Sequence, residues 1–463
     1  MMKLNQVYLP AELWLSILPL LTQANIRALA GVCLILRKIL GPSMEFKVTI
    51  MRDTSSRHAL RKALAISRTS AILDSVVEVN INTGKSRNTY WGSERASNVP
   101  YHLFPAVFCL VKAIPAMRRL HTIHLTGMIL LGTYLYTILS SPNLIHLILE
   151  AVQLPKMSKF PPPKLRKLTL TAMFSWEALQ PLVTQLATSL EYLELERCSF
   201  WSPQELRLPP FPRLRELRHH QNHTSCKFSS KCRLSEVFRL GSRVTHLHLS
   251  GEFDHTCVSA FPKTLQNLSI EEWMLTEQVF AKFLLPQLVS LSIRCHQRWW
   301  KMDFLAALPS FIRDRFPGIT SLHFNLPWSL RHFVLALARS QYNLQTLKLF
   351  IDTKFGLDRE EVFIRYPEWV SDDIDRKIMW PAALQSIKLE VVQTYCELEW
   401  SVTPCTQWIS DNVLPSVTGL GSSDLKNVEV LFIQPESELA WKRVLWKRWI
   451  RTPNNDWKIE KCL

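Results

Sequence analysis

The stretch Leu120-His-Thr-Ile123-His-Leu125 holds the pattern that decides the fold, a six-residue apolar spacing of the form L-x-x-L-x-L. Residues 144–149 and 165–170 repeat it, and eight further copies, one of them partial, make eleven between residues 120 and 389. Most neighbouring copies start 21 to 25 residues apart, as in the steps from 120 to 144 and from 144 to 165. A period of about 20–29 residues is typical of a solenoid in which each repeat adds one short strand and a returning helix. The sequence therefore predicts a repeat array rather than an ordinary mix of strands and helices.

The composition agrees with such an array and excludes two classes of nucleotide-binding fold. The 463 residues include 12 glycines against 27 prolines, with 47% hydrophobic and 20% charged residues. This apolar content is too high for a disordered chain. Neither G-x-G-x-x-G nor G-x-x-x-x-G-K-[ST] occurs, so no glycine-rich phosphate loop of these kinds is expected. Several copies follow a proline, such as Pro142 or Pro212, at a position where a strand loses no hydrogen-bond donor.

From about residue 70 to 433 the sequence resembles leucine-rich repeat proteins, in an irregular form without a strict Asn in each turn. The resemblance implies an α/β fold, a curved leucine-rich repeat solenoid of strand–helix repeats. We assign connecting and first irregular repeats to 51–119 and the main array to 120–433. Two intervals are too long for one repeat and predict insertions near 354–380 and 391–424. Acidic clusters in the first insertion are interpreted as solvated loops and not as metal ligands.

Strand alternation predicts which side chains of each repeat face a partner. The fourth and sixth positions of L-x-x-L-x-L are expected in the core, and the third, fifth and seventh on the concave face. That face carries a mixed polar ladder with few apolar anchors, which suits the recognition of a folded polar surface. The candidate substrate-binding residues on it are His124, His146, Lys167, Tyr192, Glu194, His246, His248, Arg294 and His323.

We expect no catalytic centre, metal site or cofactor. No trio of nucleophile, base and orienting group stands out on the predicted face. His246 and His248 share a face, and residues 219–232, which we expect to form a loop between repeats, concentrate His and Cys. Neither group has the ligand spacing of an ordinary zinc site. The ten cysteines form no C-x-x-C pair and are interpreted as reduced thiols of an intracellular protein.

The sequence predicts neither a membrane span nor an export signal. Residues 125–149 lack Lys, Arg, Asp and Glu, but Ser140-Ser-Pro-Asn143 interrupts them and the repeat accounts for the same leucines. Near the N-terminus, Glu12 interrupts the apolar run and no small-residue cleavage site follows. We therefore expect a cytoplasmic or nuclear location.

Residues 1–50 form a separate helical module in this interpretation. Leu13, Ile17 and Leu21 follow helical spacing behind Pro10, and Asn25 is expected to cap a second helix. So short a segment has more apolar surface than it can bury by itself, so the array or a partner must cover it.

The same segment resembles the F-box motif over residues 8–40. The matching residues are Leu9, Pro10, Glu12, Leu13, Ile17, Leu18, Leu21, Val32 and Cys33, with Leu36 at the family's aromatic position. F-box proteins with leucine-rich repeats select substrates for Skp–cullin–F-box ubiquitin ligases. The resemblance implies that these residues bind the Skp adaptor, and through it a cullin ligase, while the repeats bind the protein to be ubiquitinated. The alternative is that the segment only caps the array.

Residues 434–463 contain many Trp and basic residues, and the segment from Glu438 to Arg451 predicts a helix. Trp441, Leu445 and Trp449 fall on one helical face, which we expect to cover the end of the array. A membrane surface or a nucleic acid is the alternative partner of such a basic helix.

Three functions follow from the sequence. We favour a non-catalytic substrate adaptor of a ubiquitin ligase. A leucine-rich repeat scaffold without a link to ubiquitin is the second, and a nucleic-acid-binding protein that uses the net charge of +16 is the third. The third is disfavoured because no block of five or six basic residues occurs. The identity of the substrate is not encoded in any motif we recognise.

Overall fold

The computed structural model divides the chain into two compact units, and each is described by itself. The first unit is Met1–Leu214 with Arg218–Leu240, and the second is Arg215–Leu217 with Gly241–Leu463. The residues that the structure describes are 17, 20–32, 45–83, 102–155, 164–173, 176–196, 198, 208–220, 235–238, 242–250, 260–271, 285–294, 310–326, 343–352, 383–392, 426–437, 440–452 and 457–462.

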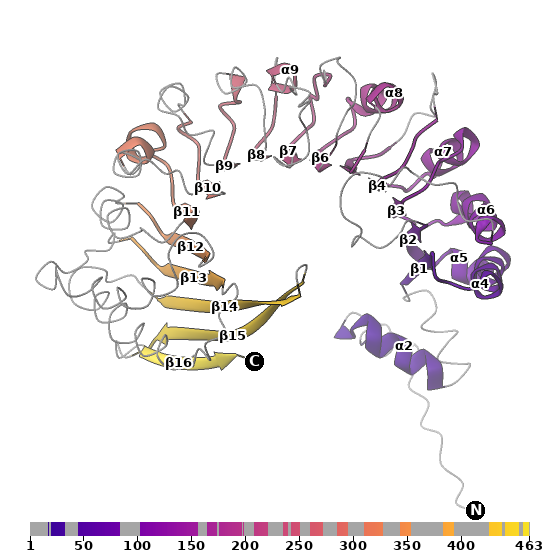
Figure 1. Cartoon of the computed structure of the whole chain (residues 1–463), viewed down its shortest axis with the longest axis horizontal. Coiled ribbons are helices and arrows are strands. Elements are labelled where there is room, and N and C mark those ends of the chain that lie inside the picture. Colours follow the sequence, from indigo (N-terminus) through magenta and orange to yellow (C-terminus); the bar gives the residue numbers. More distant parts are fainter. Residues whose placement is uncertain are drawn as a thin grey trace, which may run out of the picture. The chain divides into compact units, whose positions relative to one another are not determined.

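The first unit is a parallel sheet with helices on one face. Its strands pair in sequence order: β1 Phe46–Met51, β2 Val76–Asn82, β3 Thr122–Thr126, β4 His146–Glu150, β5 Lys167–Thr171 and β6 Tyr192–Glu196. The helices are α2 Gln23–Val32, α4 Ser56–Arg68, α5 Ser70–Leu73, α6 Phe104–Ala113, the short 3₁₀ helix η3 Ile114–Ala116, α7 Gly132–Leu139, α8 Trp176–Leu186 and α9 Ser235–Phe238. Figure 1 shows α4, α6, α7 and α8 on the same side of β1–β6.

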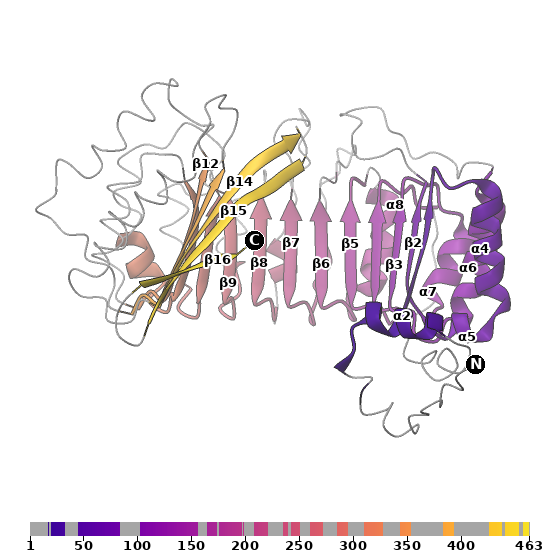
Figure 2. The same ribbon diagram turned by 90° about the horizontal axis from the view of Figure 1, so that it is seen from below.

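The second unit continues the pattern and ends in antiparallel strands. Its parallel strands are β8 His246–Ser250, β9 Asn267–Glu271, β10 Ser290–Arg294, β11 Ser321–Leu326, β12 Thr346–Asp352, β13 Ser386–Val392 and β14 Asn427–Ser437. Strands β15 Ala440–Arg451 and β16 Trp457–Cys462 then add to β14 in antiparallel order, as Figure 2 shows. Strand β7, Glu216–His220, is divided between the two units.

Equivalent repeat positions lie side by side in the sheet. In the first unit Ile123 pairs with Leu147, Leu147 with Leu168, and Leu168 with Leu193, and all four are fully buried. Strands β3 to β6 thus place their fourth and sixth repeat positions in one apolar layer. The predicted α/β leucine-rich repeat array and its core face are confirmed for the described strands.

Each turn after β3, β4 and β5 adopts a left-handed backbone conformation. The residues are Gly127 with φ 68°, Ala151 with φ 50° and Ala172 with φ 52°. Each donates its N–H to the last carbonyl of the next strand at 2.8 Å, for example Ala172 to Glu196. The left-handed residue thereby extends the hydrogen-bonded ladder by one step, although two of the three positions carry a Cβ that disfavours this conformation.

The long interval before β13 does not break the array. Strands β12 and β13 pair directly, and the N–H of Gln385 donates to the carbonyl of Gln345 at 2.8 Å. The interval therefore adds no strand between these two neighbours. The predicted insertions near 354–380 and 391–424 lie outside the described residues. Over the part of the chain that the structure describes, no helix is long and apolar enough to cross a membrane.

The predicted C-terminal helix is wrong, because its residues form strand β15. Leu445 and Trp449 are spaced by four, and this spacing places residues on one face of a strand as well as of a helix. A register shift in the pairing with β14 lies between Leu445 and Arg443, so Trp441 is out of phase with these two. Pairing with β14 satisfies the backbone groups along that strand's edge, which a packed helix would leave open. Aromatic and β-branched residues also favour strands.

Three smaller expectations differ from the structure. Strand β1 crosses the module boundary drawn at residue 50. Thr22, and not Asn25, caps α2, because its hydroxyl accepts the N–H of Asn25 at 3.3 Å, three positions into the helix. His219 and His220 belong to β7 rather than to a loop, with His219 buried in place of a repeat leucine.

Candidate protein-binding face

The side chains that alternate with the buried leucines form what we call the polar strand face. Strands β4 and β6 both alternate between half-buried and buried residues. Of the candidate residues, His124, His146, Tyr192, Glu194, His248 and His323 are half-buried on this face, and Lys167 and His246 are exposed. Arg294 ends β10, and its side chain lies outside the described part.

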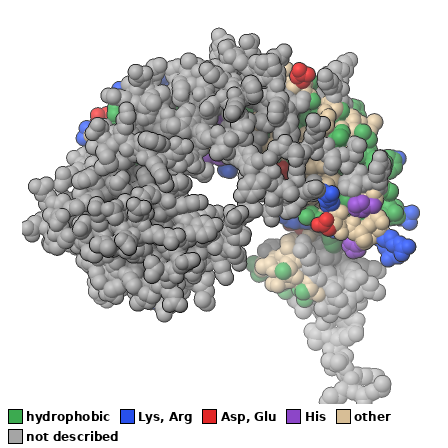
Figure 3. All heavy atoms as spheres, in the orientation of Figure 1, with side chains coloured by type: hydrophobic (Ala, Val, Ile, Leu, Met, Phe, Trp, Pro, Cys, Tyr) green, Lys and Arg blue, Asp and Glu red, His purple; other side chains and the backbone are tan. Residues whose placement is uncertain are grey.

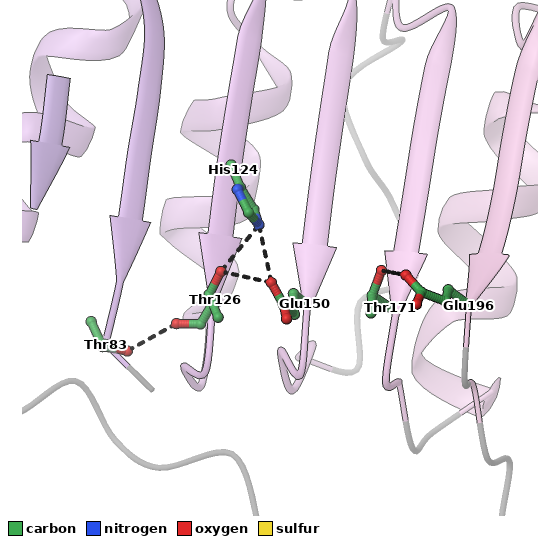
Figure 4. Close-up of polar contacts among 6 residues, drawn as sticks. All are labelled: Thr83, His124, Thr126, Glu150, Thr171 and Glu196. Atoms are coloured by element: carbon green, nitrogen blue, oxygen red, sulfur yellow. Dashed lines mark hydrogen bonds and ion pairs between the residues drawn. The ribbon is translucent and has the colours of Figure 1, made fainter. Parts of the chain in front are cut away.

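Hydrogen bonds connect this face from one strand to the next. On β3 the hydroxyl of Thr126 donates to Glu150 Oε2 of β4 at 3.4 Å, and it lies 3.1 Å from His124 Nε2 (Figure 4). The same histidine nitrogen lies 3.4 Å from that carboxylate oxygen. A hydroxyl that donates its one proton to Glu150 accepts from His124, which places a proton on Nε2. One carboxylate thus fixes two side chains of the preceding strand.

A second network of the same kind joins β4, β5 and β6. His146 Nε2 lies 3.2 Å from the hydroxyl of Thr169, and that hydroxyl donates to Glu194 Oε2 at 3.3 Å. The Tyr192 hydroxyl donates to the same oxygen at 2.7 Å. Two residues further along these strands, Thr171 donates to Glu196 Oε2 at 3.4 Å, as Figure 4 also shows. A threonine on one strand therefore repeatedly orients a glutamate on the next.

The surroundings of His146 favour its neutral form. Burial lowers the pKa of His146 from its ordinary value of 6.5, and the charge of Lys167 lowers it further, against an opposing effect of Glu194. A neutral imidazole with its proton on Nε2 can still donate to Thr169. Burial also raises the pKa of the Cys198 thiol to about 12, so this thiol stays protonated at neutral pH.

The second unit carries similar contacts between neighbouring strands. His246 Nε2 lies 2.8 Å from Asn267 Nδ2, and its other ring nitrogen lies 2.9 Å from the Thr245 hydroxyl. The hydroxyl of Ser292 lies 3.3 Å from His323 Nδ1. Within the described ranges no group of three or more His, Cys, Asp or Glu residues could hold a metal ion.

The candidate residues predicted from the sequence do not include those of β2, although this strand extends the same face. Glu78, Asn80 and Asn82 pair in register with Thr122, His124 and Thr126. Glu78 also forms an ion pair with Lys47 of β1 at 2.7 Å. The spacing Val76-x-x-Val79-x-Ile81 was the available signal, but without leucine it stands out less than the later copies.

The F-box-like residues fall mostly outside the described part of the chain. The residues that lie outside it are Leu9, Pro10, Glu12, Leu13, Leu18 and Cys33. Ile17 and Leu21 are half-buried, and Val32 ends α2. The neighbouring Leu20 is 82% exposed.

Comparisons with known proteins add little to this description. No protein-family model and no curated protein matches the chain. Among solved structures it is similar to TLR13 in the crystal structure of a TLR13–ssRNA13 complex, with 15% identity and a TM-score of 0.40 over 75% of this chain. The match covers 43% of the TLR13 chain, so this chain spans less than half of that protein's length. Strand register and buried repeat residues, and not this likeness, assign the described chain to the leucine-rich repeat fold.

Proposed function

We propose that the chain is a non-catalytic adaptor that binds a target protein through the polar strand face and a Skp adaptor through its F-box-like segment. The observation that supports target binding is the order of the polar strand face. Thr126, Thr169 and Thr171 hold glutamates of the next strand in place through hydrogen bonds. Side chains that are already ordered lose less conformational entropy when a partner binds, which favours affinity.

The exposed basic residues of this face provide its test. Lys167 and Arg218 are exposed within β5 and β7, and Lys164 and Arg213 are exposed just before these strands. The variant Lys167→Glu/Arg218→Glu is expected to lose target proteins in affinity purification. The control Lys164→Glu/Arg213→Glu has the same charge change and is expected to keep them. Equal loss in both variants would show that overall charge, and not the strand face, selects the proteins.

The F-box-like motif supports the second half of the proposal. So short a module has more apolar surface than it can bury alone, which favours a partner that covers it. The double change Leu9→Ala/Pro10→Ala is expected to abolish co-purification with the Skp adaptor. Recovery of the adaptor unchanged by this variant would contradict the assignment. If the unsubstituted protein also recovers no Skp adaptor, the result instead favours a scaffold without a link to ubiquitin.

In this proposal the chemistry belongs to the partners. The adaptor holds a target protein near the ligase. The target's lysines are then present at a high effective concentration when ubiquitin is transferred to them. Nothing in the strand-face geometry requires a reactive group of the chain itself.

A further inference from the structure

Helix α4 presents a row of arginines away from the sheet. Its 13 residues include Arg57, His58, Arg61, Lys62 and Arg68 and no acidic residue. Ala59, Ala63 and Ile66 are buried, whereas Arg57, Arg61 and Arg68 are exposed. On a helix, residues at i, i+4 and i+11 lie along one face, so the three arginines form one stripe opposite the buried residues.

The three arginines of this stripe have no partner for their side chains among the residues that the structure describes. Lys62 donates to the carbonyl of Thr49 at 2.9 Å, but Arg57, Arg61 and Arg68 have no ion pair or hydrogen bond through their side chains among the described residues. Arginine is suited to bidentate binding of carboxylates and phosphates. The stripe is therefore a surface whose binding capacity is unused within the described chain.

Exposed aromatic rings lie on the helix next to α4. Helix α6 packs against α4 and exposes 43% of Phe104 and 36% of Phe108. Their rings stack with centroids 6.5 Å apart, and Tyr134 of α7 lies 6.4 Å and 6.3 Å from the two rings. In Figure 3 hydrophobic and basic side chains lie next to one another at the outer edge of the described part of the first unit.

The position of Lys112 favours a protein partner over a nucleic acid. Its Nζ lies 4.3 Å from the centroid of the Phe108 ring, above the ring face. A nucleobase that stacks needs this face, so the lysine would have to be displaced. Aliphatic side chains of a protein partner can contact the ring edges while a carboxylate pairs with the ammonium group.

We propose that the outer surface of α4 and α6 docks an acidic amphipathic helix of a partner protein. Arg57 and Arg68 are separated by about 16 Å along the axis, at 1.5 Å per residue. A partner helix that lies parallel to α4 can place three carboxylates opposite the three arginines. Its acidic residues then occupy positions i, i+4 and i+11 of its own sequence. The exposed rings of Phe104 and Phe108 on the neighbouring helix α6 offer the apolar contact that an amphipathic helix needs beside its carboxylates. This surface is on the opposite side of the sheet from the polar strand face and is independent of the proposed function.

The test uses the full chain and a synthetic helical peptide. The peptide has Glu at i, i+4 and i+11 and Leu on the adjoining stripe, and its fluorescence anisotropy reports binding at low salt. A scrambled peptide of the same composition and a single-stranded RNA are the comparison probes. The variant Arg57→Glu/Arg61→Glu/Arg68→Glu removes the stripe. The control Lys164→Glu/Arg213→Glu/Arg243→Glu makes the same charge change at three other exposed positions.

We expect the stripe variant to weaken peptide binding by about tenfold or more, and the control to leave it within about twofold. Phe104→Ser/Phe108→Ser is expected to weaken it as well, with circular dichroism checking that this variant is folded. If it does not fold, the charge variants decide. Equal loss in stripe and control variants, equal binding of the scrambled peptide, stronger binding of the RNA, or no binding of the peptide would each overturn the proposal.

Discussion

Replacing Ala172 by glycine is expected to stabilise the protein, although the same change usually destabilises one. Ala172 follows β5 with φ 52°, in the left-handed region that an L-residue occupies at a cost of about 1–2 kcal/mol. Glycine removes this strain but loses about 0.5–1 kcal/mol through the greater freedom of the unfolded chain. The difference is a net gain of up to about 1.5 kcal/mol in the free energy of unfolding, and about 0.75 kcal/mol at the middle of both ranges. The hydrogen bond from the residue 172 N–H to Glu196 is retained.

The assay is urea unfolding monitored by circular dichroism. The urea concentration at the midpoint is compared between variants whose unfolding free energy has the same slope against urea concentration. Ala65→Gly is the control, because Ala65 is exposed within α4 and there the change should lower stability by about 1 kcal/mol. Gly127→Ala, at the equivalent turn with φ 68°, should also lower it by roughly 0.5–1 kcal/mol. If Ala172→Gly destabilises the chain as much as Ala65→Gly does, the left-handed turn and the reasoning built on it are refuted.

Three further changes test the packing and the polar strand face. Gly318→Ala should lower stability by about 1–3 kcal/mol in the same urea assay, because a Cβ there would lie 2.9 Å from the Pro286 carbonyl oxygen; an unchanged midpoint would contradict this close approach. Leu168→Ala, at a fully buried position, should cost about 2–5 kcal/mol by the same measurement, and a loss below about 1 kcal/mol would argue against the apolar layer. Because the folded pKa of His146 is lowered, its contribution to stability is complete above its ordinary pKa of 6.5 and is lost as the pH falls from there towards the folded value. His146→Gln should therefore reduce the loss of unfolding free energy between about pH 7.5 and pH 5, and an identical pH dependence would exclude this role.

The repeat leucines made the array and its core face predictable. Leu147, Leu168 and Leu193 recur at one position of each copy, and a solenoid places equivalent positions side by side. The position and alternation of His124 and His146 followed from the same pattern. Thr169 and Glu194 occupy the same position of neighbouring copies, so their pairing followed as well, but the hydrogen bond between them depends on side-chain conformations that the pattern does not contain.

Two other features could not be read from local spacing. The left-handed turns carry alanine at residues 151 and 172, where glycine or asparagine would have been the signal. Strand β15 depends on the open edge of β14, a long-range cause that outweighs an apolar spacing compatible with both helix and strand. In each case the surroundings, rather than the residue types, decide the backbone conformation.

The central claim is that two separate surfaces serve two different partners. The most direct measurement is quantitative affinity purification of three full-length chains, namely the unsubstituted protein, Leu9→Ala/Pro10→Ala and Lys167→Glu/Arg218→Glu. The account predicts that the first variant loses the Skp adaptor and keeps the other captured proteins. The second should keep the adaptor and lose those proteins. Loss of the same set of proteins in both variants, or no Skp adaptor with any of the three chains, would contradict the account.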